Sequence, residues 1–196
     1  CLSRRSLLGI GAQALGGLAL FGRGATAALR APPPGGAIRF DVLRGDDVVG
    51  QHEVDFRADG GRLAVETRIE VSVSVLGVVV FRYRHLGIES YEDGRLVRFK
   101  SETDDDGTRF RVDGEARPDG FAISTAKGML MAPKDILVGS YWTPRVLERR
   151  VLIEPKRGRI KEQRVEGRER VTVPVEGTAR AAMRYRVSGI INGTVT

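Results

Sequence analysis

Cysteine is almost absent from the 196-residue chain, which contains only Cys1. A chain with one cysteine forms no internal disulfide, and it lacks the several thiolates of a cysteine-type zinc site. Beyond the first residue it also has no cysteine nucleophile. The rest of the chain is therefore free of thiol chemistry and suits an oxidising compartment.

Catalytic signatures are also scarce, since the chain has two histidines and no G-x-S-x-G motif. Ser140, in the sequence GSYW, has no base that the sequence makes evident. The acidic run Asp104–Asp106 before Gly107 lacks the alternating spacing of an EF-hand loop, which favours a solvated hairpin turn over a calcium site. We expect no enzymatic activity, no metal and no cofactor.

The chain has no apolar run of the length that a membrane-spanning helix needs. Residues 7–21 are apolar, but four glycines interrupt them and they fall short of the roughly 20 residues of a span. Arg4 and Arg5 precede this run, and Ala25 and Ala27 follow it with the small-x-small spacing that a signal peptidase accepts. The order SRRSLL resembles the twin-arginine export motif.

We therefore expect residues 1–27 to be a twin-arginine signal peptide, with the twin-arginine translocase and a signal peptidase as partners and the periplasm as destination. An uncleaved membrane anchor is the less favoured alternative. Residues 28–36 contain three consecutive prolines and predict a linker. Removing residues 1–27 lowers the formal net charge from +7 to +4, and we expect an anionic envelope lipid or polymer, not nucleic acid, to meet the remaining charge.

From residue 37 onward the sequence alternates between apolar and polar residues. In residues 63–75, LAVETRIEVSVSV, the odd positions are apolar or Thr from Val65 on, and the even positions are polar, so one face of a strand is buried. Asp-Gly pairs at 93–94, 106–107 and 119–120 predict tight hairpins between such strands. We expect about nine or ten strands in an antiparallel meander.

Only one segment departs from this alternation. Pro144 can open a short helix within residues 139–150. A sheet with one apolar face has to cover it with a second sheet or by curling. The predicted fold class is mainly β: a single domain over residues 37–196, either a curved half-barrel or a β-sandwich, with one short helix.

Three stretches carry a family resemblance: IRFDVLRGDDVVGQHEVDF, PKDILVGSYWTP and VPVEGTARAAMRYRVSG. Together they resemble an uncharacterised family of exported bacterial β-rich proteins. The resemblance implies a fold and a location but no chemistry. Members of such a family continue past the last hairpin with another strand pair, so we expect a domain that is truncated at its C-terminus, near residues 192–196.

His52 and His85 fall on the apolar side of their strands. Two histidines that converge inside a β-cup can bind a ligand or relay protons, but core or rim histidines bonded to a carbonyl are the favoured interpretation. We expect no carboxylate of the same parity nearby, and hence no metal site. The opposite face mixes arginines, such as Arg82 and Arg84, with acids, which favours a solvated face over an anion-binding patch.

Tyr141 and Trp142 lie where the strand pattern stops, and Trp142 is the only tryptophan of the chain. Such a pair either plugs the open side of the sheet or lines a pocket there, and we favour the plug. Tyr141, Trp142, His52 and His85 are the candidate ligand-binding residues.

We expect a non-enzymatic periplasmic protein that binds or carries an apolar or amphipathic envelope molecule, by analogy with half-barrel carriers of lipoproteins. The alternative is a structural or protein-interaction domain with a filled core and no ligand. An enzyme that uses His52 or His85 is the least favoured hypothesis. The interior distinguishes the first two, because a carrier needs a cavity of several hundred Å³.

Overall fold

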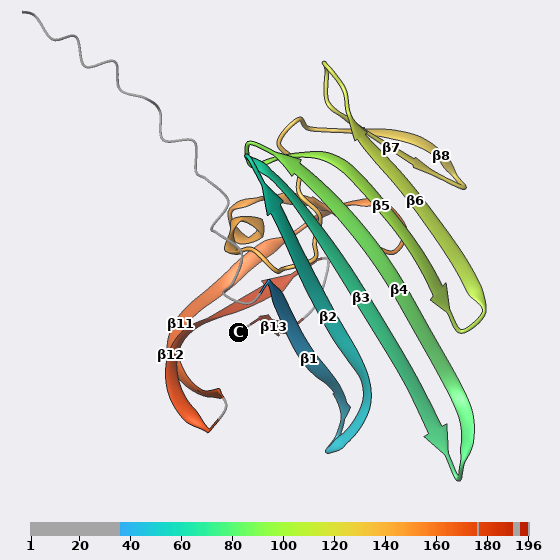
Figure 1. Cartoon of the computed structure of the whole chain (residues 1–196), viewed down its shortest axis with the longest axis vertical. Coiled ribbons are helices and arrows are strands. Elements are labelled where there is room, and N and C mark those ends of the chain that lie inside the picture. The colour runs from blue at the N-terminus through green and yellow to red at the C-terminus, as the bar shows by residue number, and fades with distance from the viewer. Residues whose placement is uncertain (1–35, 176, 190–192, 196) are drawn as a thin grey trace, which may run out of the picture.

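The computed structural model describes residues 36–175, 177–189 and 193–195 (Figure 1). The predicted signal peptide, with Arg4, Arg5, Ala25 and Ala27, lies outside the described residues, as do the predicted linker residues 28–35. Within the described part, no helix has the length and apolar character needed to span a membrane.

An eight-stranded antiparallel meander forms the body of the molecule, with each strand beside the next one in sequence. The sheet is not closed into a barrel. The predicted fold class, a mainly β meander with one short helix, is confirmed. The strands are β1 (Ala37–Arg44), β2 (Asp47–Asp59), β3 (Arg62–Val75), β4 (Val78–Glu92), β5 (Arg95–Asp105), β6 (Thr108–Ala116), β7 (Phe121–Thr125) and β8 (Gly128–Ala132).

Asp-Gly turns connect β4 to β5 and β5 to β6. Asp93 and Gly94 both have positive φ, 46° and 78°, between β4 and β5, and Asp106 and Gly107 have 50° and 87° between β5 and β6. Two consecutive residues with positive φ match the right-handed twist of a two-residue hairpin. The predicted hairpin at the aspartate run is confirmed: Asp104 Oδ1 accepts a hydrogen bond of 2.8 Å from the Gly107 amide.

A segment after β8 folds back over one face of the sheet. It contains the 3-10 helix η1 (Pro144–Glu148) and the short strands β9 (Val151–Ile153) and β10 (Ile160–Glu162), followed by β11 (Arg164–Val175), β12 (Thr178–Ser188) and β13 (Gly193–Val195). The β11–β12 hairpin extends away from the main sheet (Figure 1). Thirteen strands are described, against the nine or ten predicted, because strands of three residues are too short for alternation to reveal.

The 3-10 helix begins where the sequence predicts. Pro144 stands in its first turn, and the Thr143 side chain caps it. Val146 of this helix joins Leu137 and Ile153 in a cluster with the inner face of the sheet, including Val65 and Phe99. The segment of residues 136–153, here called the cover segment, therefore buries part of that face.

The inner face is not covered along its whole length. The predicted parity of β3 is correct, but burial falls from Val65, which is 0% exposed, to Val75, which is 48% exposed. Val71, predicted to lie in the core, is only half-buried. The reason is that the cover segment packs on the Val65 end of this face. Beyond it, β2 pairs with β3 only as far as Val71, and β5 pairs with β4 only as far as Tyr83, so the far end also lacks neighbouring strands.

Candidate functional site

A cavity of about 780 Å³ lies between the inner face of the sheet and the segment that crosses it. Strands β1 to β5 contribute to its wall, as do residues 138–142 and 154–156. Ile38, Val54, Ile69, Phe99 and Val138 supply apolar surface. The volume is within the roughly 300–1,000 Å³ of pockets for small molecules.

All four predicted ligand-binding residues line this one cavity. Strand register explains the two histidines, because His52 on β2 and His85 on β4 both pair with Ile69 on β3. Residues that pair directly across neighbouring strands point to the same face, so both imidazoles lie on the inner side. The parity predicted for the two histidines is therefore correct, and both line the cavity.

The two imidazoles have different surroundings. His85 is 5% exposed, and its Nδ1 pairs with Thr103 Oγ1 at 2.7 Å. Burial, and secondarily the nearby His52, lowers the pKa of His85 to about 4. Burial also lowers the pKa of His52. Both imidazoles are therefore neutral at pH 7, and neither adds a positive charge to the cavity.

Glu89 provides a buried carboxyl in the same wall. It is 2% exposed and accepts hydrogen bonds from the Tyr91 hydroxyl and, at 3.2 Å, from Trp142 Nε1. Burial raises the pKa of Glu89, although these hydrogen bonds oppose the shift. The expectation of no carboxylate near the histidines is wrong: Glu89 lies two inward positions beyond His85 on β4, and its parity in the sequence indicated this.

Trp142 stands between the packed core and the cavity. Its ring packs edge-on against Phe56, with centroids 5.4 Å apart, and against Tyr91, with centroids 5.7 Å apart. The same side chain lines the cavity. Trp142 therefore both packs in the core, as a plug would, and forms part of the cavity wall.

Tyr141 holds the cover segment at the cavity. Its φ of 56° is unusual for a residue other than glycine. Its hydroxyl donates a hydrogen bond of 2.9 Å to Gln163 Oε1. Gln163 Nε2 in turn donates to the carbonyls of Val146 and, at 2.7 Å, of Arg149. These bonds connect the residues before and after η1 to the chain at the end of β10.

Several polar atoms of the cavity wall have no partner. His52 Nε2, Thr67 Oγ1 and Glu154 Oε2 are buried and form no hydrogen bond with any described residue. Buried polar atoms in proteins are nearly always paired, so such a group in a cavity wall marks a place for a ligand or for water. Sequence analysis missed Thr67 and Glu154, because neither residue belongs to a recognisable motif.

The charged groups of the wall restrict the ligand. Lys156 Nζ binds the carboxylate of Asp105 and lies 5.2 Å from the centroid of the Phe110 ring. It is thus already neutralised. An anionic group in the cavity would meet Glu154, and the described residues of the wall include no other lysine or arginine to balance it, so its desolvation would be costly. The wall suits a polar group that donates hydrogen bonds, such as a hydroxyl or an amide.

The outer face of the sheet is a solvated network of ion pairs, as predicted. Arg111 contacts Glu102 at 2.8 Å, and Lys100 contacts Asp113 at 3.6 Å. Pairs with both side chains about half exposed or more stabilise a protein by at most about 1 kcal/mol.

Among the described residues, no group of three or more His, Cys, Asp or Glu side chains is arranged to hold a metal ion.

Comparisons with curated proteins and with solved structures return no match. A family model does match, over residues 40–196, and its description is a domain of unknown function, DUF6134. This range begins within β1, after the cavity-lining Ile38, and includes every other residue that lines the cavity and the whole cover segment. The chain therefore belongs to the DUF6134 family of domains of unknown function.

Proposed function

We propose that this chain is a periplasmic binding or carrier protein for an amphipathic molecule, exported by the twin-arginine route and cleaved after residue 27. The observation that carries the proposal is the cavity of about 780 Å³ on the inner face of the sheet. Its apolar wall comes from five strands and from the cover segment. A domain with a filled core and no ligand, the alternative function, has no need of such a space.

The unpartnered polar atoms define the kind of ligand. A hydroxyl or amide of the bound molecule would pair with His52 Nε2, Thr67 Oγ1 or Glu154 Oε2, and its apolar part would lie against Ile69 and Phe99. A carboxylate or phosphate would be repelled by Glu154. A neutral amphipathic molecule is thus the ligand class that fits the wall best.

Binding, and not catalysis, is the proposed role of the histidines. A general base works best with a pKa near the operating pH. The pKa of His85 is about 4, and its Nδ1 is engaged with Thr103. His85 would then be a weak base at pH 7, while His52, with a free Nε2, remains available to a ligand.

Energy transfer from Trp142 tests this proposal. Trp142 is the only tryptophan, so transfer to diphenylhexatriene, an apolar dye, reports dye in or near the cavity. We expect transfer on addition of dye, and displacement of the dye by dodecanol at concentrations at least about tenfold lower than by dodecanoate, because desolvating the carboxylate is costly.

A matched pair of variants locates the dye. Ile69→Lys places an ammonium in the cavity wall, whereas Ile88→Lys makes the same change on the outer face of the neighbouring strand, where Ile88 is 39% exposed. Only Ile69→Lys should abolish the transfer. If wild type shows no transfer, or if dodecanol and both variants leave it unchanged, the cavity is not a binding site for amphipathic molecules.

A further inference from the structure

The β3–β4 hairpin extends beyond its neighbours as a ribbon of two strands. Pairing between β3 and β4 continues to Val75 and Val78, whereas β2 leaves β3 after Val71 and β5 leaves β4 at Tyr83. Figure 1 shows this end of the hairpin projecting past the ends of the other strands. We call residues 73–81 the hairpin tip.

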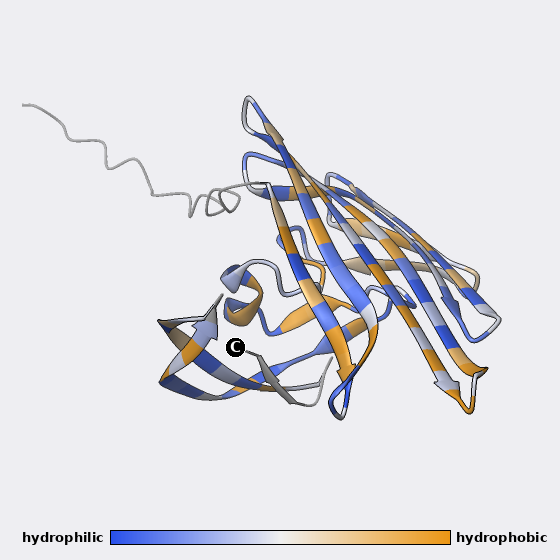
Figure 2. Ribbon diagram, turned by 60° about the horizontal axis from the view of Figure 1, so that its bottom comes forward, coloured by the Kyte–Doolittle hydropathy of each residue, from blue (hydrophilic) through white to orange (hydrophobic). Residues whose placement is uncertain are grey.

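The hairpin tip exposes a concentration of aliphatic side chains. Leu76 is 100% exposed, Val78 64%, Val80 52% and Val75 48%. Figure 2 shows hydrophobic residues on both strands at this turn. Single exposed apolar residues are ordinary, but a cluster of them at a projecting end marks an interaction site.

The charges beside the hairpin tip have one sign along the chain. Residues 71–88 include Arg82 and Arg84 and no acidic residue. Neither arginine forms an ion pair with a described residue. The carboxylates that face them lie elsewhere in the sequence. Glu70 and Asp104 are opposite Arg84, and Asp104 already contacts Arg109 at 3.9 Å. Asp106, in the turn after β5, is opposite Arg82, and its carboxylate accepts a hydrogen bond of 3.3 Å from the Arg82 amide.

The shape of the hairpin tip favours a lipid surface over a protein partner. A stable protein interface buries about 800 Å² on each side, more than a ribbon of nine residues offers on one face. A bilayer, by contrast, accepts a narrow convex protrusion, and aliphatic side chains gain by entering its acyl boundary. The turn is apolar at its extreme end and cationic behind it, which is the order of acyl chains and phosphates in a bilayer.

Distances along the strand agree with this arrangement. Arg82 lies four residues from Val78, or about 13 Å along an extended strand. Interfacial segments enter a bilayer by about 5–10 Å. The turn can therefore reach the acyl boundary while Arg82 and Arg84 stay at the phosphates, and the unpaired strand edges behind the turn remain in the hydrated headgroup layer, where water satisfies them.

We propose that the hairpin tip inserts into the surface of a phospholipid bilayer, with Val75, Leu76 and Val78 at the acyl boundary and Arg82 and Arg84 at the phosphates. This attachment does not depend on the proposed function. The two are compatible, because the inward-facing residues Val71, Val73 and Phe81 continue from the cavity wall toward the tip.

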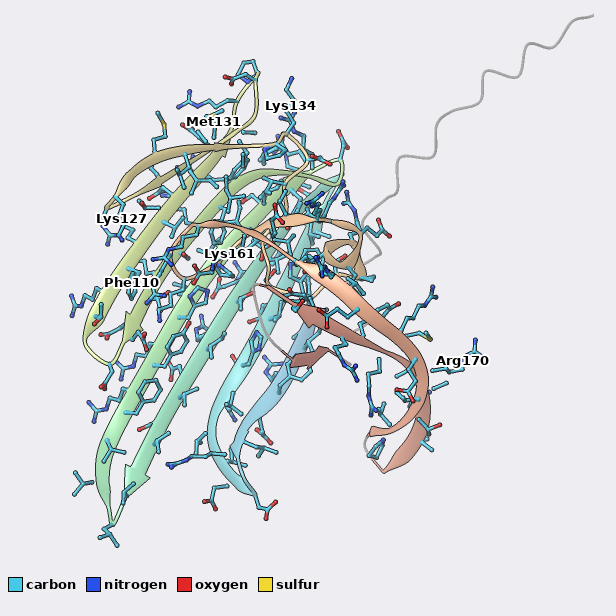
Figure 3. All side chains as sticks on the ribbon, turned by 180° about the vertical axis from the view of Figure 1, so that it is seen from behind. Phe110, Lys127, Met131, Lys134, Lys161 and Arg170 are labelled. Carbon is cyan, nitrogen blue, oxygen red and sulfur yellow. The ribbon has the colours of Figure 1, made fainter. Side chains whose placement is uncertain are left out.

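A fluorophore on the hairpin tip tests the insertion. In the full chain with Cys1→Ser, a nitrobenzoxadiazole label on Leu76→Cys is compared with the same label on Met131→Cys. Met131 is 47% exposed and lies toward the opposite end of the sheet (Figure 3). With phosphatidylcholine vesicles, and more strongly with one-third phosphatidylglycerol, we expect a blue shift of the label at 76 and none at 131.

Unlabelled variants provide a second measurement. Val75→Ser with Val78→Ser should weaken the apparent affinity for vesicles more than about tenfold, whereas Met129→Ser with Met131→Ser should not change it. Arg82→Gln with Arg84→Gln should weaken binding to phosphatidylglycerol vesicles by about 25-fold, at about fivefold for each of the two charges.

Two results would overturn the proposal. One is an unshifted label at 76 on chains that sediment with the vesicles, which would mean that another part of the chain binds them. The other is a blue shift at 76 that grows with protein concentration in the absence of lipid, which would mean that a second copy of the chain covers the hairpin tip.

Discussion

Two parts of the same strand, β3, have the same sequence pattern and opposite surroundings. At Val65 the cover segment packs on the inner face, and the side chain is 0% exposed. At Val75, five inward positions further on, the same face has no covering element among the described residues, and the side chain is 48% exposed. Alternation thus determines which face a residue occupies, whereas coverage determines whether that face is a core, a cavity wall or an exposed surface.

The largest predicted effect is the difference between one substitution made at each of these positions. Val65→Asp places an unpaired carboxylate in the packed core and should lower the free energy of unfolding by more than about 4 kcal/mol, whereas Val75→Asp should change it by less than about 0.5 kcal/mol. Urea denaturation of both variants measures this. Similar midpoints would show that the two ends of β3 are equally covered.

The second prediction concerns pH, through His85 in the cavity wall. Its pKa is about 4 in the folded protein and near 6.5 when unfolded, so the unfolded chain binds more protons between these values. The contribution of neutral His85 to the free energy of unfolding is complete above about pH 6.5 and is lost as the pH falls toward 4. The loss should be of the order of 3 kcal/mol.

The His85→Gln variant isolates this effect, because Glu89 acts in the opposite direction. The raised pKa of Glu89 makes the folded protein bind more protons than the unfolded chain above pH 4.5, so its contribution falls as the pH rises. Unfolding of wild type and His85→Gln should be compared between pH 7 and pH 4.5. Equal slopes would mean that His85 is not buried against the wall.

The third prediction tests the boundary between core and cavity at Trp142. Trp142→Phe keeps an aromatic ring beside Phe56 and Tyr91 but removes the Nε1–H group that donates to Glu89. The lost hydrogen bond should lower the free energy of unfolding by about 1–2 kcal/mol.

Glu89→Gln serves as the matched control, since an amide oxygen still accepts from Trp142. In the Glu89→Gln background, Trp142→Phe should cost less than in wild type, because an unpaired amide is easier to bury than a carboxyl group that can ionise. A double-mutant cycle that shows no coupling would contradict the Trp142–Glu89 contact.

The sequence predicted most of what the sheet contributes to the site. Period two fixes which side chains of a strand share a face, so His52 and His85 were correctly placed on the apolar side of their strands. Asp-Gly pairs predicted the β4–β5 and β5–β6 turns, whereas the Leu76-Gly77 turn between β3 and β4 was not predicted. Glu89 was missed although the same rule applied to it. All acidic residues were assigned to the solvated face, although the odd-numbered position of Glu89 on β4 places it on the same face as His85.

What the sequence did not predict is where the cover segment lies. Residues 136–153 pack on the inner face through contacts with residues distant in sequence, such as Val146 with the sheet core and Arg145 Nη1 with the Gly94 carbonyl at 2.7 Å. No local pattern encodes these contacts. The position of the cavity, and the partnership of Trp142 with Glu89, follow from that packing alone.

The smallest predicted effect concerns Thr67, at the border between packed core and open cavity, where one substitution should have opposite effects on folding and binding. Thr67 is 5% exposed, and its Oγ1 is buried without a partner. Thr67→Val keeps the shape of the side chain and removes a hydroxyl that the ligand-free protein leaves unsatisfied, so the free energy of unfolding should stay the same or rise by up to about 1 kcal/mol.

In the ligand-bound protein, Thr67 would pair with the hydroxyl of a bound alcohol, so the same change should weaken dodecanol binding about fivefold, the equivalent of one hydrogen bond. Binding of diphenylhexatriene, which has no polar group, should be unaffected. A loss of stability on Thr67→Val, or equal weakening of dodecanol and diphenylhexatriene, would mean that the hydroxyl serves the fold and that the polar part of the ligand lies elsewhere in the cavity.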